Sequence, residues 1–313
     1  MHLASYIIRR LLQMIPVFII VTVMIFLLIR AIPGDPARTM LGETATEEQI
    51  EAYRQKIGYY DPLWQQYLNF VRDLARGDLG DSLRYHEPVN DLLAERFPVT
   101  VSLTAAIVFF VVILGIPLGF IAGICKDRLP DQVIRFFALL GLSAPVFWVG
   151  LMLMLIFGVR LGWFPVSGWG TTIGDHIYAL ILPGFTQAFN VMAVIIRNLR
   201  NNVVDISRSS YVTFARSKGL SKWRIYYRYI FRNALLPTTT LLAMWIASLL
   251  GGCIVIESVF TLPGLGKLMI DSILSRDYAV VQGGVILFVV IVLVINLLTD
   301  IIYSILDPRV KLS

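Results

Sequence analysis

Long apolar runs dominate the pattern of hydrophobic and polar positions along this chain. Six of them are long enough to cross a bilayer as helices, since each crossing takes about 20 apolar residues. The runs cover residues 9–31, 100–125, 134–159, 177–197, 236–258 and 279–305. Pro117, Pro145 and Pro183 lie inside three of these runs, and membrane helices tolerate proline at the expense of a kink. The pattern predicts an all-α integral membrane protein with six transmembrane helices.

A polar segment follows the first transmembrane helix, which is expected within residues 1–32. Residues 33–98 contain 12 Asp and Glu residues against 7 Lys and Arg residues. Thr46 and Gln49 have the spacing of a capping box for a helix that ends at Gly58. Asp61-Pro62 is typical of the start of a second, amphipathic helix that ends near Gly77. We therefore expect a small helical external insertion, whose amphipathic face either packs on the transmembrane helices or forms a docking surface.

Basic residues predict the orientation of the chain. Residues 197–232 carry nine Lys and Arg residues against one acidic residue, Asp205, and residues 125–135 and the C-terminal tail are also basic. The positive-inside rule places these segments and both termini on the cytoplasmic side. Composition agrees with a membrane protein, because only 15% of the residues are charged and the mean hydropathy is +0.73, whereas soluble domains have roughly 25% charged residues. Residues 99–313 are expected to form a five-helix core.

The polar connection between the fourth and fifth apolar runs predicts a cytoplasmic helix-turn-helix. The turn is expected at Gly219, and the second helix carries Arg224, Arg228 and Arg232 at intervals of four residues. Such a rigid basic hairpin is suited to transmit force from a cytoplasmic motor. The alternative is an amphipathic segment that lies on anionic lipid. Nucleic-acid binding is not expected, because the segment is tethered between two transmembrane helices.

Several motifs occur in a specific order from one end of the chain to the other. Ala215-x-x-x-Gly219 precedes an arginine-rich helix and Asn233-Ala234-Leu235-Leu236-Pro237. Other motifs are Pro33-Gly34-Asp35-Pro36-Ala37, Gly77-Asp78-Leu79-Gly80-x-Ser82, Gly251-Gly252, Pro263-Gly264-Leu265-Gly266, Arg276-Asp277-Tyr278 and Leu306-Asp307-Pro308-Arg309. In this order the chain resembles a type I, binding-protein-dependent ABC importer permease of the dipeptide, oligopeptide and nickel family. Thr213-Phe214-Ala215 replaces the broad Glu-Ala-Ala pattern, and Phe231-Arg232 replaces a Leu-Pro pair, as in the peptide-type branch.

The resemblance implies a function and a set of partners. It implies a coupling loop at about residues 198–236 that docks on a separate ATP-binding subunit, and the docking residues would be Ala215, Arg216, Lys218, Gly219 and Leu220. It further implies a homologous second permease, two ATP-binding subunits that hold ATP and Mg, and an external substrate-binding protein. The chain itself would hold no cofactor, would be multi-pass in the cell inner membrane and would import short peptides. Nickel or a metal chelate is the alternative cargo.

Other chemistry finds little support in the sequence. Gly264-Leu265-Gly266-Lys267 lacks the spacing and hydroxyl residue of a phosphate-binding loop, so ATP hydrolysis is expected on another chain. The three histidines have no metal-ligand spacing, and no G-x-S-x-G motif occurs. We therefore expect neither catalytic residues nor a metal site. An intramembrane enzyme would need a catalytic pair in the spans, and none is evident.

Three polar residues in or near the apolar runs are candidates for the translocation path. They are Glu257, Asn296 and Asp300. Polar groups inside a membrane usually face a cavity or a partner, so these residues either line the path or pair structurally with an adjacent helix. An ion-driven secondary carrier would need acidic residues at the membrane midplane and usually an inverted repeat, and neither is evident.

Overall fold

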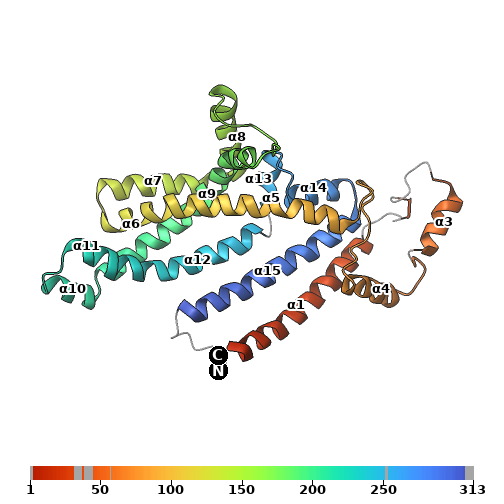
Figure 1. Ribbon diagram of the computed structural model, residues 1–313, viewed down its shortest axis with the longest axis horizontal. Helices are drawn as coiled ribbons and strands as arrows, with labels where there is room; N and C mark the ends of the chain where they lie inside the picture. The colour runs from red at the N-terminus through yellow and green to blue at the C-terminus, as the bar shows by residue number, and fades with distance from the viewer. Residues whose placement is uncertain (1–2, 32–36, 39–44, 57, 251–252, 307–313) are drawn as a thin grey trace. The chain divides into compact units, whose positions relative to one another are not determined.

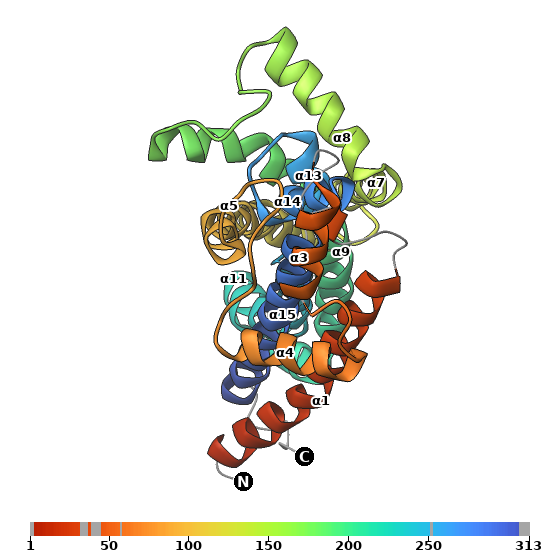
Figure 2. The same cartoon turned by 90° about the vertical axis from the view of Figure 1, so that its right-hand side faces the viewer.

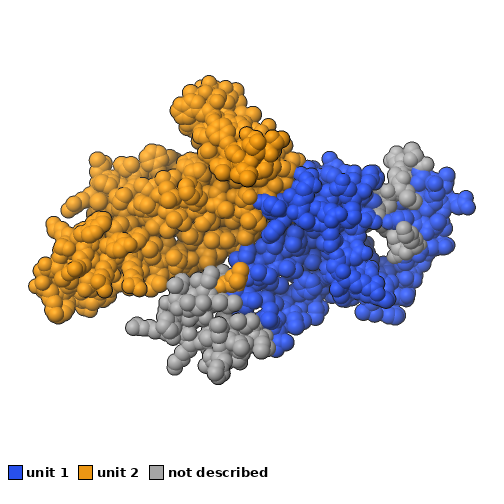
Figure 3. Space-filling view, in the orientation of Figure 1, with its two compact units in different colours: residues 1–98, 268–297, 312–313 blue, residues 99–267, 298–311 orange. Residues whose placement is uncertain are grey.

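The computed structural model describes residues 3–31, 37–38, 45–56, 58–250 and 253–306. Figure 1 shows its helices, and Figure 3 shows its two compact units. Unit 1 consists of residues 1–98, 268–297 and 312–313, and unit 2 consists of residues 99–267 and 298–311. Apart from one isolated bridge between Asp81 and Pro88, all regular structure in the described residues is helical. The predicted all-α fold class is therefore confirmed.

The helices include three π-helical segments, labelled η. In order they are α1 (Leu3–Ala31), α3 (Glu47–Lys56), α4 (Leu63–Ala75), α5 (Val89–Phe110), η1 (Val111–Gly115), α6 (Ile116–Ile124), α7 (Leu129–Ser143), α8 (Val146–Leu153), η2 (Met154–Arg160), α9 (Ile173–Ser207), α10 (Ser210–Ser217), α11 (Lys222–Arg224), η3 (Ile225–Phe231), α12 (Arg232–Leu250), α13 (Ile254–Val259), α14 (Leu265–Leu274) and α15 (Tyr278–Leu306).

Five helical stretches in the described residues are long and apolar enough to cross a membrane. They are Arg9–Ala31, Val89–Ile124, Ile173–Ser207, Lys222–Leu250 and Tyr278–Leu298. A sixth crossing is obtained if the bent pair formed by residues 129–143 and 146–160 counts as one. The second stretch begins at Val89, so the predicted boundary between insertion and core, at residues 98 and 99, falls within α5.

The third apolar run, residues 134–159, is predicted as a span kinked at Pro145, but the structure breaks the helix there. The chain bends by 108° between α7 and α8. Ala144 is extended, with φ −80° and ψ 132°, and Pro145 follows it directly. A residue before proline is disfavoured in the helical region, so the helix stops there instead of merely kinking. Figure 1 shows α8 leaving the direction of α7, and Figure 2 shows the same break from the side.

The expectation that the fifth span extends to residue 258 is wrong. The helix that begins at Lys222 continues without a break through η3 and α12 to Leu250. Gly251-Gly252 lie outside the described residues, and the next helix, α13, is separate. Glu257 therefore lies on a short helix beyond the span.

Unit 1 contains the predicted insertion helices. Thr46 and Gln49 make both bonds of a capping box, and Gly58 has a φ of +64° beyond the end of α3, as predicted. The amphipathic helix α4 packs on α1: the Tyr67 and Phe70 rings lie 5.3 and 6.1 Å from the ring of Phe26, which is buried. The Asp61-Pro62 start predicts Asp61 as the cap of α4 and Pro62 in its first turn, which is wrong, because Pro62 occupies the cap position and no side chain bonds there.

The loop before α5 is fixed to the start of α15 by a buried carboxylate of unit 1. Asp277 is fully buried and accepts a 2.6 Å hydrogen bond from the Ser82 hydroxyl and a 3.2 Å bond from the backbone N–H of Arg84. These bonds join two of the sequence motifs, Gly77-Asp78-Leu79-Gly80-x-Ser82 and Arg276-Asp277-Tyr278. The carboxylate thus orders a loop that has almost no regular secondary structure.

Unit 2 is organised around α9. Of the most apolar 18-residue window of α9, 67% is buried, against 17–33% for the other four stretches. Glycines on α6 and α7 let their backbones approach it closely. A Cβ at Gly119 would lie 3.1 Å from the Cα of Ile196, and one at Gly141 would lie 2.7 Å from the backbone oxygen of Phe189. A side chain at either position would push the helices apart, so these glycines hold α9 in the centre.

Candidate functional site

The predicted helix-turn-helix is present between α9 and α12, and we refer to residues 210–231 as the basic hairpin. Figure 1 shows α10 and α11 at the far end of α9 and α12. Gly219 forms the turn with a φ of +74°, a conformation that costs most other residues about 1 to 2 kcal/mol. Ser221 caps the second helix by accepting a bond from the backbone N–H of Arg224. The turn therefore needs a glycine for its backbone conformation.

A small apolar core of its own holds the basic hairpin against α9. Its buried residues are Leu199, Val203, Val212, Ala215, Ile225, Ile230 and Ala234. Ala215 is only 4% exposed, so it packs inside the hairpin. Arg216, Lys218 and Gly219 are exposed and Leu220 is half-buried. Of the five residues predicted to dock on a partner, four are thus accessible, and Ala215 packs in the apolar core beneath them.

Aromatic residues form a partly exposed stripe beside the arginines of the basic hairpin. Trp223 and Tyr227 are 79% and 63% exposed, and their rings stack at 6.5 Å. Tyr227 stacks on Phe231 at 6.0 Å, and Phe231 meets Phe120 of α6 at 4.8 Å. The spacing of four residues between Trp223, Tyr227 and Phe231 was the available signal, because such residues lie on one helix face.

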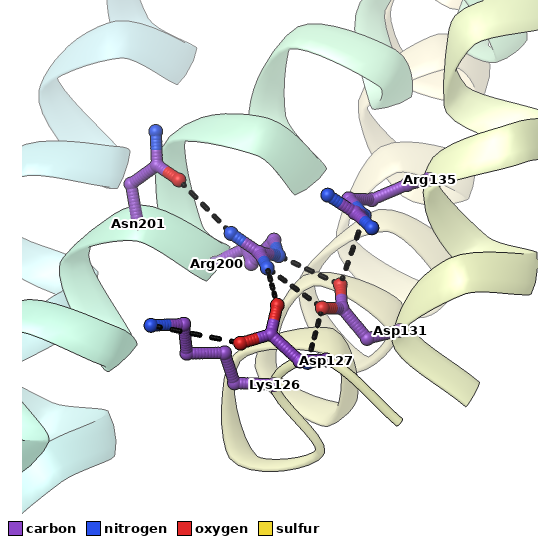
Figure 4. Close-up of polar contacts among 6 residues, drawn as sticks. All are labelled: Lys126, Asp127, Asp131, Arg135, Arg200 and Asn201. Carbon is purple, nitrogen blue, oxygen red and sulfur yellow. Dashed lines mark hydrogen bonds and ion pairs between the residues drawn. The ribbon is translucent and has the colours of Figure 1, made fainter. Parts of the chain in front are cut away.

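An ion pair ties α9 to α7 shortly before the basic hairpin. The Arg200 guanidinium donates bonds of 2.7 and 2.6 Å to the two oxygens of Asp131. Asp131 is fully buried, and the Arg200 side chain is 13% exposed. Asp131 also accepts a 2.8 Å bond from the backbone N–H of Asp127, and Arg135 lies 3.5 Å away. Figure 4 shows the carboxylate of Asp131 between the two arginines. The ion pair therefore fixes to α7 the end of α9 from which the basic hairpin extends.

Glu257 lies in the core of unit 2. It is fully buried and accepts a 2.7 Å bond from the hydroxyl of Thr100, on α5, and a 3.0 Å bond from the backbone N–H of Lys267. A Cβ at Gly264 would lie 2.3 Å from its carboxyl carbon, so the loop wraps the carboxylate too closely for a side chain there. Burial raises the pKa of Glu257, and the donated bonds act in the opposite direction. This is the arrangement expected for structural pairing with an adjacent helix.

The other two candidates for the translocation path lie on α15. Asn296 is exposed. Asp300 is helical in its backbone, and its side chain lies outside what the structure describes. That these residues and Glu257 line a path stays a prediction. Within the described part of the chain, no group of three or more His, Cys, Asp or Glu residues could hold a metal ion.

Comparisons with known proteins match almost the entire chain. Residues 115–312 match the model of the family "Binding-protein-dependent transport system inner membrane component", and residues 3–104 match the model of the corresponding N-terminal region. The chain is 38% identical to the oligopeptide transport system permease protein AppB of Bacillus subtilis, over 99% of this chain and 100% of that protein. It is also 38% identical to the glutathione transport system permease protein GsiC of Escherichia coli K12, over 98% of this chain and 99% of that protein.

Breaking the pair of Asp131 and Arg200 is expected to destabilise unit 2. Arg200→Gln leaves a buried carboxylate without its main partner, which costs about 3 to 5 kcal/mol. The double variant Asp131→Asn/Arg200→Gln should lose less than the sum of the single variants, because neither charge is left alone. Thermal unfolding of the purified chain in detergent measures both effects. Asp127→Asn is the matched control, since Asp127 is 71% exposed and 3.9 Å from Arg200; an equal loss in that variant would contradict the role of the pair.

Removing the carboxylate of Glu257 is expected to unfold the loop that surrounds it. Glu257→Ala leaves the buried Thr100 hydroxyl and a backbone N–H without acceptors, at a cost of about 1 to 3 kcal/mol for each group. Glu257→Gln keeps one oxygen acceptor and the side-chain volume, so its thermal unfolding in detergent should lie between those of wild type and Glu257→Ala. If the Ala variant unfolded at the wild-type temperature, the carboxylate would not be organising the loop.

Proposed function

Because the chain belongs to the family of binding-protein-dependent transport system inner membrane components, a family of multi-pass membrane transport proteins and not of enzymes, we propose that it is a permease subunit of an ATP-driven importer of short peptides. Its relatives are named for the transport of oligopeptides and glutathione, which are both peptidic. These names, on relatives that match over nearly their full length, support peptides over nickel or a metal chelate as the cargo.

The proposed importer contains a substrate-binding protein, which the family description mentions, and further subunits that the family resemblance implies. A substrate-binding protein delivers the peptide at the external face, and a second, homologous permease completes the path. Two ATP-binding subunits hold ATP and Mg and supply the energy, so this chain binds neither. The concentration of Lys and Arg at residues 197–232 supports an orientation with the basic hairpin and both termini in the cytoplasm.

One observation carries the proposal of coupling: the basic hairpin is exposed on its outer side and rigidly supported on its inner side. Arg216, Lys218 and Trp223 are accessible to a partner, whereas Val212 and Ala215 anchor the hairpin on α9. The helix that begins at Lys222 runs for 29 residues to Leu250, a length of about 43 Å. A push on the hairpin by a closing pair of ATP-binding subunits would therefore act directly on a membrane-spanning helix.

Reconstitution tests the proposed function. We expect proteoliposomes that contain both permeases, both ATP-binding subunits and the binding protein to take up a labelled oligopeptide only when ATP is supplied. Vesicles that contain this chain alone should not transport it. Uptake by the chain alone, driven by an ion gradient without ATP, would contradict the proposal and favour a secondary carrier.

Gly219→Val is expected to uncouple ATP hydrolysis from uptake. No atom lies within 4 Å of a Cβ at Gly219, so the variant is strained through its backbone and not through a clash, and a β-branched residue is especially unfavourable at positive φ. Gly219→Asn is the matched control, because asparagine tolerates the left-handed conformation. In the reconstituted importer, the number of peptides transported per ATP hydrolysed should fall strongly in the Val variant and should stay close to the wild-type number in the Asn variant. Equal coupling in the two variants would count against a role for the turn.

A further inference from the structure

We propose that a groove between α7 and α9 binds one anionic phospholipid, with the phosphate at Arg135 and Arg197 and an acyl chain along the apolar side chains beside them. The groove has a volume of about 590 Å³, which is within the usual range of small-molecule sites. Its lining residues are Gln132, Arg135, Phe136, Ala138, Leu139, Leu142, Ala193, Ile196, Arg197, Arg200 and Asn201. The proposed lipid site does not depend on the coupling mechanism or on the peptide cargo.

Charge and hydrophobicity are separated along the length of the groove. The two helices run in opposite directions here, because Arg200 on α9 pairs with Asp131 near the start of α7, whereas Asn190, earlier on α9, donates a 2.9 Å bond to the backbone oxygen of Gly141 near the end of α7. Arg135 lies about 6 Å further along α7 than Asp131, and Arg197 lies about 4.5 Å back along α9 from Arg200, at a rise of 1.5 Å per residue. Both arginines therefore lie at nearly the same level, one turn from the ion pair.

Apolar side chains continue from that level for the rest of the groove. On α7 they extend to Leu142, about 10 Å beyond Arg135, and on α9 they extend to Ala193, about 6 Å beyond Arg197, at a rise of 1.5 Å per residue. Phe136, Leu139 and Leu142 are 57%, 61% and 41% exposed. A phospholipid has the same order of groups, an anionic phosphate followed by a hydrocarbon chain, and basic pockets between transmembrane helices bind such headgroups.

The arginines differ in their availability. Asp131 receives two bonds from Arg200, so that guanidinium is already engaged. Arg135 touches Asp131 only at 3.5 Å and its side chain is 49% exposed. Arg197 is exposed and has no hydrogen bond or ion pair with any residue that the structure describes. The ion pair thus holds the two helices together, and Arg135 and Arg197 keep donors free for a phosphate.

Native mass spectrometry of the purified full chain in detergent tests the site. We expect phosphatidylglycerol to bind at least about tenfold more tightly than phosphatidylcholine with the same acyl chains, given the attraction of two arginines to an anionic headgroup. Arg135→Gln/Arg197→Gln should abolish this preference, and Arg197→Gln alone should reduce it. Asp131 keeps both bonds from Arg200 in these variants, so the thermal unfolding temperature should fall much less than it does in Arg200→Gln. Arg128→Gln/Arg208→Gln removes the same charge outside the groove and should keep the preference.

Further measurements distinguish a bound lipid from other occupants of the groove. Leu139→Gln, at an exposed position, should weaken the binding of both lipids, because the acyl chain loses part of its apolar surface. Inorganic phosphate at millimolar concentration should not displace phosphatidylglycerol; full displacement would overturn the proposal in favour of a free-phosphate site. The assembled importer should retain the bound lipid. Loss of the lipid when the second permease is present would overturn it in favour of a protein interface, and an unchanged preference in Arg135→Gln/Arg197→Gln would overturn it outright.

Discussion

The close contact of α9 with α6 and α7 is the constraint on which unit 2 depends. Lipid offers no hydrophobic driving force between helices, so association relies on close packing and on interhelical polar contacts. Gly119 and Gly141 allow the close packing, since a Cβ at either would lie 3.1 Å or less from the α9 backbone. Asp131 and Arg200 supply the interhelical polar contact. The basic hairpin follows α9 directly, so the packing of α9 also fixes the position of the hairpin.

The proposed coupling through the basic hairpin depends on this arrangement. Ala215 and Val212 fix α10 to the end of α9, and α11 continues into the long helix that ends at Leu250. The hairpin therefore joins the most buried helix of unit 2 to a helix that is only 22% buried in its most apolar window. Under the proposed mechanism, a force on the hairpin would act between a well-buried helix and a less buried one, and would displace the less buried helix more readily.

The sequence predicted those features that are encoded locally. The capping box of Thr46 and Gln49 and the turn at Gly219 depend on residues within one or two helical turns of each other, and the structure contains both of them. The outcome at Pro145 was underestimated, because a proline alone does not distinguish a kink from a bend of 108°. The pair of Asp131 and Arg200 lies 69 residues apart in sequence, and only the packing of α7 on α9 brings it together.

Polar residues in apolar surroundings were the hardest to interpret, because a sequence does not reveal whether such a group is already satisfied. In the sequence, Glu257 is an acidic residue at the end of an apolar run and therefore a candidate for the translocation path. In the structure, the Thr100 hydroxyl and the backbone N–H of Lys267 already donate hydrogen bonds to its carboxylate. Positive charge presents the same difficulty. Arg200 is held by a buried carboxylate and Arg216 is exposed on the hairpin, although both contribute equally to the charge asymmetry that predicts topology. The count of basic residues thus indicates the side of the membrane, and only their partners determine whether each one joins helices, meets another protein or remains available to an anion.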